Sequence, residues 1–404
     1  MKIIYVTKQL PYAETEAFIL PEIASHDARG WEVWLAPTQS GPLVHDECKR
    51  LLSLTLYSWL LAPNVLLAFL MELFANPGRT LAWGVRAAGS GRLAIRNLAV
   101  WPKGVWLGRQ ARLLGVEHIH IHWCSVPATM GMIAADIAGV PFSITAHRYD
   151  IAQGNLLAEK ARRAAFIRAI DQDGADEIAA QIEATGVTPW LLRMGVKLSG
   201  TAAPLREGAL SPLRLVMAAR FVEKKGHHVL FEAMEILRRS GLPVTCDLFG
   251  SGPLVQSLEA IAESRDLTQE VRFKGVLDHK ALLATLLSGA YDLAVLPSLV
   301  ARDEDKEGIP VFLMEAMGAG LPTVSTPNGG IRELADGDSC LLVPERDAKA
   351  LAAALEHLAR DANARFRLAA AGRQKVAQDF EIEACMRNLR QAIEHSVKAP
   401  GAAL

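Results

Sequence analysis

The chain has 404 residues, of which 50% are apolar and 22% are charged, and its formal net charge at pH 7 is −1. This length is typical of two or three domains, each able to bury a full core, and the near-zero charge excludes a global attraction to nucleic acid. The five cysteines match neither a disulfide framework nor a zinc spacing, which favours a reducing cytosol. They are Cys48, Cys124, Cys246, Cys340 and Cys385.

The amino terminus enters a strand directly. Residues 2–7 predict a first buried strand, residues 18–29 a helix that ends at Gly30, and residues 31–36 a second strand. A charged region followed by an apolar core and a cleavage site is missing from this start, so we expect no secretory signal.

The most apolar stretch runs from Leu51 to Met71 and contains no charged side chain. It is long enough to span a bilayer. Pro63 and Asn64 interrupt it at the middle, and proline breaks a helix when it lies in the interior. We therefore expect two buried or interfacial helices here.

A basic region follows over residues 73–116, with no aspartate or glutamate. Basic side chains attract anionic head groups and tryptophan prefers the membrane interface, so we expect this region to dock on the cytoplasmic leaflet. The alternatives are an ordinary helical insert with a solvated basic face, or a surface for an anionic glycan or nucleic acid, although no aromatic RNA-binding motif accompanies it. The basic residues are Arg79, Arg86, Arg92, Arg96, Lys103, Arg109 and Arg112, and the tryptophans are Trp83, Trp101 and Trp106.

Three histidines, His118, His120 and His122, alternate in the segment EHIHIHW, so a strand places them on one face. Such a set can bind a metal. Alternate residues of a strand lie roughly 6 to 7 Å apart, and we find no neighbouring cysteine or carboxylate that would complete a tetrahedral set. We therefore predict no metal, with His122 near a substrate and the other two packed in the core.

The carboxyl half contains two strands followed by polar groups. Residues 213–219 predict a buried strand, and Arg220 and Lys225 follow at its carboxyl end, where open α/β sheets bind ligands. An arginine can bind a diphosphate with two donors and a lysine adds a point charge. A pair of solvated charges is the alternative.

The second strand covers residues 291–298 (YDLAVLPS) and leads through a polar loop to Glu307. Pro310 suits the first helical position, and the helix continues to a stop at Gly318. Free N–H groups at a helix start bind anions, and the flanking carboxylates of Glu307 and Glu315 can accept hydrogen bonds from sugar and ribose hydroxyls. This pattern predicts a nucleotide-sugar site.

Taken together, these segments resemble family 4 retaining glycosyltransferases of the GT-B fold, of the exopolysaccharide and colanic-acid type. ARFVEKKGH (219–227) is similar to the family's phosphate segment, and LFGSGPL (248–254) to its glycine turn. FKGVLDHKAL (273–282) resembles the segment that lines the nucleobase pocket. The sequence from 307 to 337 is the most similar part.

The resemblance implies an α/β protein with two Rossmann-like domains facing a central cleft. Residues 1–198 would bind the acceptor and carry a hydrophobic and basic helical insert at about 48–115. Residues 199–378 would bind the donor, with 199–211 as the linker, and residues 379–404 would form a helix that packs back on the first domain.

The resemblance also implies roles for individual residues. Glu307 would contact the donor sugar and Glu315 the ribose, while Arg220 and Lys225 would hold the diphosphate. His147, at the end of a strand predicted within VPFSITAHRYD (140–150), would lie beside the donor sugar and phosphate, with Asp150 orienting its loop. The other expected donor contacts are Gly250, Gly252, Gly275, Val276, Gly308, Ile309, Pro310 and Val311, with Gly329, Gly330 and Glu333 in a nearby turn.

For Gly250 and Gly252, a strand-to-helix turn that needs positive φ is the alternative to ligand approach. The loop over residues 9–18 departs from the family's glycine-rich loop and is similar, in a shifted form, to the S-E-T-F-I type of exopolysaccharide enzymes, so its contact with the donor stays open.

The implied function is retaining, metal-independent transfer of a sugar from a UDP- or GDP-type donor to a lipid-linked or surface polysaccharide precursor. No cofactor and no nucleic-acid partner are expected, and the protein would sit peripherally on the inner face of the cell membrane. The alternatives are a soluble small acceptor or a non-catalytic scaffold that binds nucleotide sugars.

Overall fold

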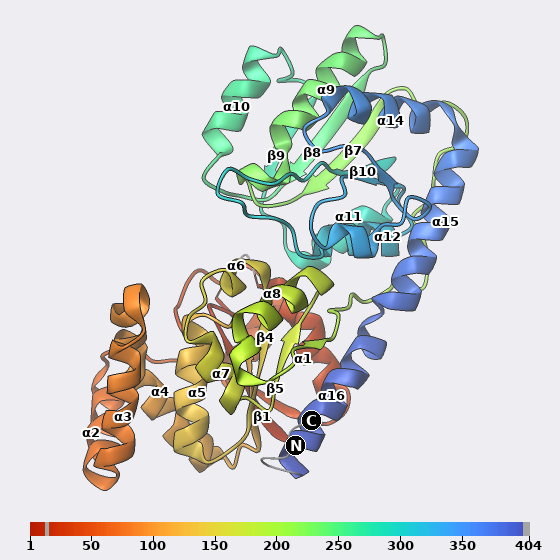
Figure 1. Ribbon diagram of the computed structural model, residues 1–404. Coiled ribbons are helices and arrows are strands. Elements are labelled where there is room, and N and C mark those ends of the chain that lie inside the picture. Colours follow the sequence, from red (N-terminus) through yellow and green to blue (C-terminus); the bar gives the residue numbers. More distant parts are fainter. Residues whose placement is uncertain (13–15, 399–404) are drawn as a thin grey trace. The chain divides into compact units, whose positions relative to one another are not determined.

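A computed structural model of the chain describes residues 1–12 and 16–398. The chain divides into two compact units (Figure 1). Unit 1 comprises Met1–Met194 with Glu383–Leu404, and unit 2 comprises Gly195–Ile382. Each unit is an α/β structure built on one six-stranded parallel sheet, with helices on both faces.

The sheet of unit 1 has the strand order β2-β1-β3-β4-β5-β6. Its strands are almost wholly buried, as expected for a parallel sheet that is covered on both faces. The direction of strand progression reverses between β1 and β3, which creates a topological switch point. The strands are β1 Lys2–Thr7, β2 Glu32–Pro37, β3 His118–His122, β4 Phe142–Ala146, β5 Phe166–Ala169 and β6 Trp190–Leu191.

The helix expected over residues 18–29 is shorter than predicted. A 3-10 turn, η1 (Ala17–Ile19), precedes α1 (Leu20–Asp27), and Pro21 occupies the first turn of α1. Proline has no N–H to donate, which suits a helix start and not a helix interior. The other helices that cover this sheet are α5 Val126–Ala138, α6 Arg148–Ile151, α7 Leu157–Arg163, α8 Gln172–Ile182 and α16 Ile382–Lys398, with the 3-10 turn η4 Glu183–Thr185.

The carboxyl-terminal helix α16 packs within unit 1. The Ser396 hydroxyl lies 3.1 Å from Nδ1 of His118 in β3, and the Arg390 guanidinium donates to the Ser25 hydroxyl of α1 at 2.6 Å. The end of the chain therefore contributes to the core that its beginning forms.

The segment between β2 and β3 is an insert of helices. It contains η2 Asp46–Leu54, α2 Pro63–Ala75, α3 Pro77–Ala88, η3 Gly91–Leu93 and α4 Ala94–Leu114. The apolar run 51–71 thus contains the end of the 3-10 helix η2 and the start of α2, so two helical segments lie in it as predicted, but only the second, which Pro63 begins, is an α-helix. Across the described ranges 1–12 and 16–398, no single helix is long and apolar enough to cross a membrane; α2 and α3 pass only as a pair, bent by 119°.

Part of the predicted basic surface is instead core. Lys103 is buried and its Nζ donates to the carbonyl oxygens of Pro37 at 2.8 Å and Thr38 at 3.1 Å. Trp83 and Trp106 are also buried. Helix α4, which carries Lys103 and Trp106, packs closely on α5, since a Cβ added at Gly108 would lie 2.6 Å from the Ala134 carbonyl oxygen. Trp83 of α3 donates to the Asp136 carboxylate of α5 at 2.8 Å. The tryptophan part of the membrane prediction is therefore wrong for these two tryptophans.

The sheet of unit 2 has the order β12-β11-β10-β7-β8-β9, so its switch point lies between β7 and β10. Its strands are β7 Leu213–Ala218, β8 Val244–Phe249, β9 Val271–Gly275, β10 Leu293–Leu296, β11 Thr323–Ser325 and β12 Leu341–Leu342. The helices are α9 His227–Arg239, α10 Val255–Ser264, α11 His279–Leu287, α12 Val311–Gly318, α13 Ile331–Leu334, α14 Ala348–Arg360 and α15 Ala362–Asp379, with the 3-10 turn η5 Glu223–Lys225.

The segment expected as a linker, residues 199–211, packs against unit 2. The N–H of Ala203 donates to the Ala319 carbonyl at 2.7 Å, and the N–H of Leu210 donates to the Ala359 carbonyl at 2.8 Å. Both side chains are buried. This segment is therefore part of the unit 2 surface, and the change between units comes earlier, after Met194.

Candidate functional site

Glu307 lies in the loop after β10, at the switch point of the unit 2 sheet. Its buried carboxylate is 2.7 Å from Nζ of Lys225, which follows β7, and it accepts a hydrogen bond from the Ser298 hydroxyl at 3.0 Å. The Glu307 N–H donates to the Asn328 side-chain oxygen at 2.9 Å, in the loop after β11. Loops from three neighbouring strands thus meet at Glu307, two of them at its carboxylate and the third at its backbone N–H.

Two glycines fix the backbone around this carboxylate. Gly226, which follows Lys225, has φ +68°, and a Cβ there would lie 1.9 Å from the Pro297 carbonyl oxygen. Gly329 has φ +50°, and a Cβ there would lie 2.1 Å from the Glu307 carbonyl oxygen. Only glycine allows these approaches, so Gly329 supports the loop of Glu307 through its backbone.

Arg220 is the cation of this site that remains free. It follows β7, its residue is exposed, and within the described part of the chain its guanidinium makes no hydrogen bond or ion pair. A guanidinium without a protein partner can place two donors on a diphosphate. Lys225, by contrast, is already bound to Glu307.

Gly250 and Gly252 serve the packing of two loops. A Cβ at Gly250 would lie 2.0 Å from the Ala219 carbonyl oxygen, and one at Gly252 would lie 2.5 Å from that of Phe221. The Gly250 N–H donates to the Gly275 carbonyl at 2.8 Å. Both glycines therefore help to hold the segment that carries Arg220, and their contact with a ligand stays a prediction.

Glu315 is buried on α12, and one of its carboxylate oxygens lies 2.6 Å from Nε2 of His279, at the start of α11. Helix α12 begins one residue later than expected. Pro310 has φ −68° and ψ 120°, so it is the N-cap and Val311 is the first helical residue. The extended ψ of Pro310 is the reason, since a helical residue needs a negative ψ.

In unit 1, His147 follows β4 and is buried. Its Nε2 lies 3.3 Å from Nδ1 of His122, whose Nε2 lies 3.2 Å from the Glu22 carboxylate; the other Glu22 oxygen accepts from Arg168 at 2.7 Å. An ionised carboxylate only accepts, so His122 carries its proton on Nε2, and in the neutral ring Nδ1 accepts from His147. The side chains of His147, His122, Glu22 and Arg168 thus form one continuous chain of hydrogen bonds, which we call the relay.

The charges of this relay are set by burial and by Arg168. Burial, the largest influence, holds the pKa of His147 well below its usual range, so that the ring is neutral at pH 7. For Glu22, burial alone raises the pKa, but the Arg168 charge and the His122 hydrogen bond outweigh it and hold the pKa well below its usual range. Asp150 accepts from the His147 N–H at 2.7 Å and thereby holds the loop.

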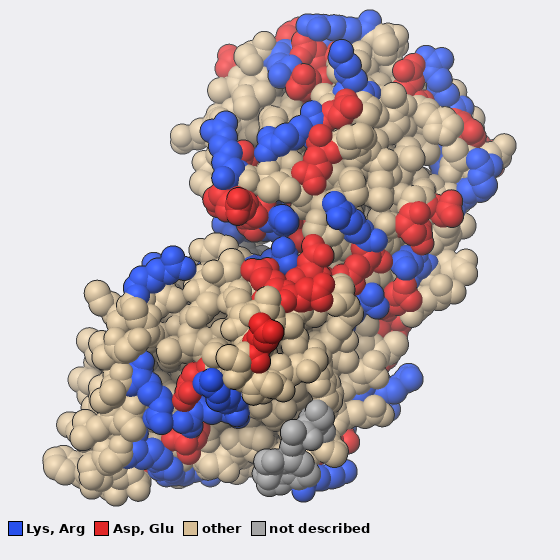
Figure 2. All heavy atoms as spheres, viewed as in Figure 1, with Lys and Arg blue, Asp and Glu red and all other residues tan. Residues whose placement is uncertain are grey.

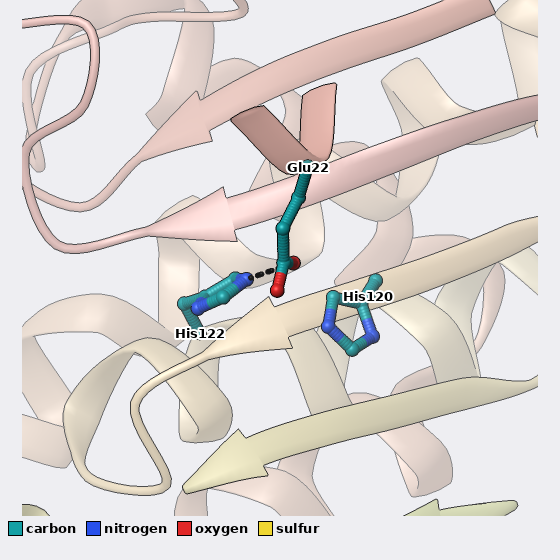
Figure 3. Close-up of side chains that lie close together, drawn as sticks. All are labelled: Glu22, His120 and His122. Atoms are coloured by element: carbon teal, nitrogen blue, oxygen red, sulfur yellow. Dashed lines mark hydrogen bonds and ion pairs between the residues drawn. The ribbon is translucent and has the colours of Figure 1, made fainter. Parts of the chain in front are cut away.

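Glu22, His120 and His122 place their ligand atoms within 4.8 Å of one another (Figure 3). The expectation that no carboxylate lies near these histidines is therefore wrong, since α1 brings Glu22 there from a distant part of the sequence. However, Arg168 holds one Glu22 oxygen, and His120 binds the hydroxyls of Ser143 at 2.7 Å and Thr145 at 2.9 Å. This donor set fits a hydrogen-bond network better than a cation site. His118 and His120 are packed, as predicted.

The loop after β1 is held by an internal carboxylate. Glu16 is buried and accepts from the N–H groups of Gln9 and Leu10, both at 2.6 Å, and from Nε1 of Trp123. A glycine-rich loop would offer such amides to a phosphate; here Glu16 binds them. Residues 13–15 of this loop lie outside the described residues.

Sequence reasoning missed five polar residues of these two clusters. They are Glu22, Arg168, His279, Ser298 and Asn328. Ser298 and Asn328 both follow a buried strand, which is a signal that could have identified them. Glu22 gave no such signal, because it lies inside a helix.

The relay predicts a specific dependence of stability on pH. Because the folded-state pKa of Glu22 is depressed, its contribution to stability is present above the unfolded pKa of about 4.3 and is lost as pH falls below it. We expect Glu22→Gln to lower the free energy of unfolding at pH 7 by about 3 to 5 kcal/mol, since Arg168 is left buried without a counter-charge. Chemical denaturation at pH 7 and pH 4 checks this, with the exposed Glu304→Gln as the control. An unchanged stability at pH 7 would contradict the buried pair.

Comparison with known proteins places these clusters in context. Residues 209–375 match the family described as glycosyl transferases group 1. The chain is 36% identical over 225 residues to WcaL of Salmonella typhimurium, named for colanic acid biosynthesis, covering 54% of this chain and 55% of that protein. It is 37% identical over 203 residues to the amylovoran biosynthesis glycosyltransferase AmsK of Erwinia amylovora, covering 50% and 49%. The chain thus spans about half the length of these curated relatives.

The crystal structure of Anabaena HepE in complex with UDP-glucose is similar over 98% of this chain and 100% of that chain, with a TM-score of 0.71 and 18% identity. At this identity the similarity shows the fold alone. Residues 209–375 therefore match the glycosyl transferases group 1 family, in a chain with the GT-B fold.

Proposed function

We propose that this protein is a glycosyltransferase that moves a sugar from a nucleotide-diphosphate sugar to a polysaccharide precursor. The observation that carries the proposal is the Lys225–Glu307 pair at the switch point of unit 2, with Arg220, whose guanidinium has no partner among the described residues, on the same loop as Lys225. The names of the relatives WcaL and AmsK, both for polysaccharide biosynthesis, support the acceptor class. The presence of UDP-glucose in the HepE crystal structure supports a UDP- or GDP-type donor.

In the proposed mechanism, Arg220 and Lys225 bind the diphosphate, Glu315 accepts from the ribose hydroxyls, and Glu307 accepts from a sugar hydroxyl. The bond between the anomeric carbon and the phosphate oxygen breaks, the acceptor oxygen bonds to the same face of that carbon, and the leaving phosphate takes the acceptor proton. Fixed cations that stabilise the departing diphosphate lower the barrier most. The step needs no metal ion or cofactor.

The donor site can be tested without knowledge of the acceptor. We expect one series among UDP-, GDP- and ADP-sugars to raise the melting temperature, since a ligand that binds only the folded state stabilises it. Arg220→Ala should fold normally and bind that donor about 10- to 100-fold more weakly, because a hydrogen bond to a charged group is worth about 1.5 to 3 kcal/mol. The exposed Arg302→Ala is the matched control. Stabilisation by no nucleotide sugar would contradict the proposal.

The role of Glu307 needs a substitution that keeps its shape. We expect Glu307→Gln to reduce nucleotide release from the stabilising donor at least about 100-fold, because the amide cannot hold Lys225 as an ion pair or accept in the same way from the sugar. Release is measured with and without a membrane lipid extract as acceptor. Activity like that of the wild type in a normally folded Glu307→Gln protein would remove Glu307 from the site.

We further propose that the acceptor is lipid-linked and that unit 1 contacts the inner face of the cell membrane through residues 51–112. Arg92 and Arg96 support this contact, since both are exposed and make no hydrogen bond or ion pair with the described residues. Arg86 contributes less charge, because it lies 3.4 Å from the Glu159 carboxylate.

Reversal of these charges tests the membrane contact. Each basic residue near an anionic surface contributes about 1 kcal/mol, so the triple variant Arg86→Glu, Arg92→Glu, Arg96→Glu should bind phosphatidylglycerol vesicles more than about 100-fold more weakly at low salt. Co-sedimentation measures this. The same vesicle affinity in the triple variant and the wild type would exclude these arginines from the contact.

A further inference from the structure

One face of α2 exposes apolar side chains to solvent. Leu66, Leu67, Leu70, Met71 and Phe74 recur at helical spacing, and 60% of Leu67 and 84% of Phe74 are exposed. The area over α2 and α3, at the lower left of Figure 2, is largely free of charged side chains, with basic groups beside it. Contiguous apolar patches of this kind mark binding surfaces. The neighbouring exposed residues are Trp59, Leu61, Leu81 and Val85.

The opposite side of α2 is already buried in unit 1. Val65, Ala68 and Glu72 face the core, and Phe69 meets the Trp101 ring of α4 edge-on at 4.8 Å. A helix that is apolar on all sides is buried in a core or in a membrane. The 13 residues of α2 extend about 20 Å, less than the roughly 30 Å of a bilayer core. The helix is therefore suited to lie in the surface of a membrane.

A groove of about 330 Å³ opens beside this face, between α2 and α4. Leu67, Met71 and Leu113 supply apolar walls, and Arg109 stands among the lining residues as the charged group. A largely apolar groove with one cation suits an amphipathic ligand that has an anionic head.

Arg109 belongs to a cluster with excess positive charge. Three guanidinium groups surround the buried Glu72 carboxylate: Arg79 at 2.7 Å, Arg109 at 3.2 Å and Arg112 at 3.6 Å. The Asp136 carboxylate, which accepts from Trp83, lies nearby. Even when it is counted, three arginine side chains stand against two carboxylates, so positive charge is in excess. Because Glu72 fixes these side chains in place, the cluster is preorganised for an anion.

We infer that α2 lies in the surface of an anionic bilayer, with a phospholipid chain in the groove between α2 and α4 and its phosphate on the cluster of Arg79, Arg109 and Arg112. This inference rests on the proposed membrane contact and adds to it a defined lipid site. It also divides the binding between an apolar part, which salt does not weaken, and a charged part, which salt screens.

The apolar part is tested by the double variant Leu67→Ser, Phe74→Ser. Both side chains are exposed, so the variant keeps the fold, and it should bind mixed phosphatidylglycerol–phosphatidylcholine vesicles at least about tenfold more weakly at physiological salt. Phe366→Ser, on α15 of unit 2 and 41% exposed, is the matched control and should bind like the wild type. Vesicle affinity equal to that of the wild type in the double variant overturns the inference.

The head-group part is tested by Arg109→Gln. The ratio of its affinity for phosphatidylglycerol vesicles to its affinity for pure phosphatidylcholine vesicles should fall about fivefold. The control is Arg360→Gln, at a paired surface arginine of unit 2, which should leave this ratio unchanged. An unchanged ratio in Arg109→Gln overturns the head-group assignment.

Two outcomes separate this inference from the others. If the wild type is a dimer, and the double variant is monomeric with unchanged vesicle binding, the α2 face belongs to a second copy of the chain and the inference fails. If the wild type does not bind vesicles at all, both the proposed membrane contact and this inference fail. The donor-induced rise in melting temperature stays a separate measure of the glycosyltransferase proposal.

Discussion

The ion pair between Lys225 and Glu307 is the interaction on which the unit 2 site depends. It joins loops that follow β7 and β10, the two strands between which the sheet reverses its order. Burial of either charge alone is costly, whereas the pair is stable when its remaining lone pairs are satisfied, and Ser298 satisfies one of them. Gly226 and Gly329 make the geometry possible, since a side chain at either would collide with a neighbouring carbonyl. The ion pair therefore depends on these two glycines as well as on the two charges.

Unit 1 uses the same principle with different groups. Glu22 reaches from α1 to the ends of β3 and β5, where it binds His122 and Arg168, and His147 completes the chain of contacts. A second carboxylate, Glu16, holds the loop after β1. Both carboxylates lie at the switch point of their sheet, where parallel strands leave unsatisfied N–H groups and side chains that can converge. Rigid support of this kind is what an uncharged His147 needs to keep one orientation.

The helical insert changes the surface of unit 1 without entering this network. Its buried side packs α4 closely on α5 through glycines, while α2 turns leucine and phenylalanine side chains to solvent. The arginines beside α2 come from two helices, Arg79 from α3 and Arg109 and Arg112 from α4, and are held around one carboxylate, Glu72 of α2. Charge and apolar area are thus adjacent on one side of the unit.

The sequence alone determined β1 to β4, β7 and β10 and the positions of Glu307, Lys225 and Arg220, because buried parallel strands are continuous apolar runs and polar residues after them gather at one sheet edge. It also indicated the α/β class and the family resemblance. It could not show that Glu22 joins the histidines or that His279 meets Glu315, since these contacts link residues 100 and 36 positions apart. Nor could composition tell that Lys103 and Trp83 are core while Phe74 is exposed. Only tertiary packing decides which face of a helix is covered, because that depends on which neighbour approaches closely enough to bury it.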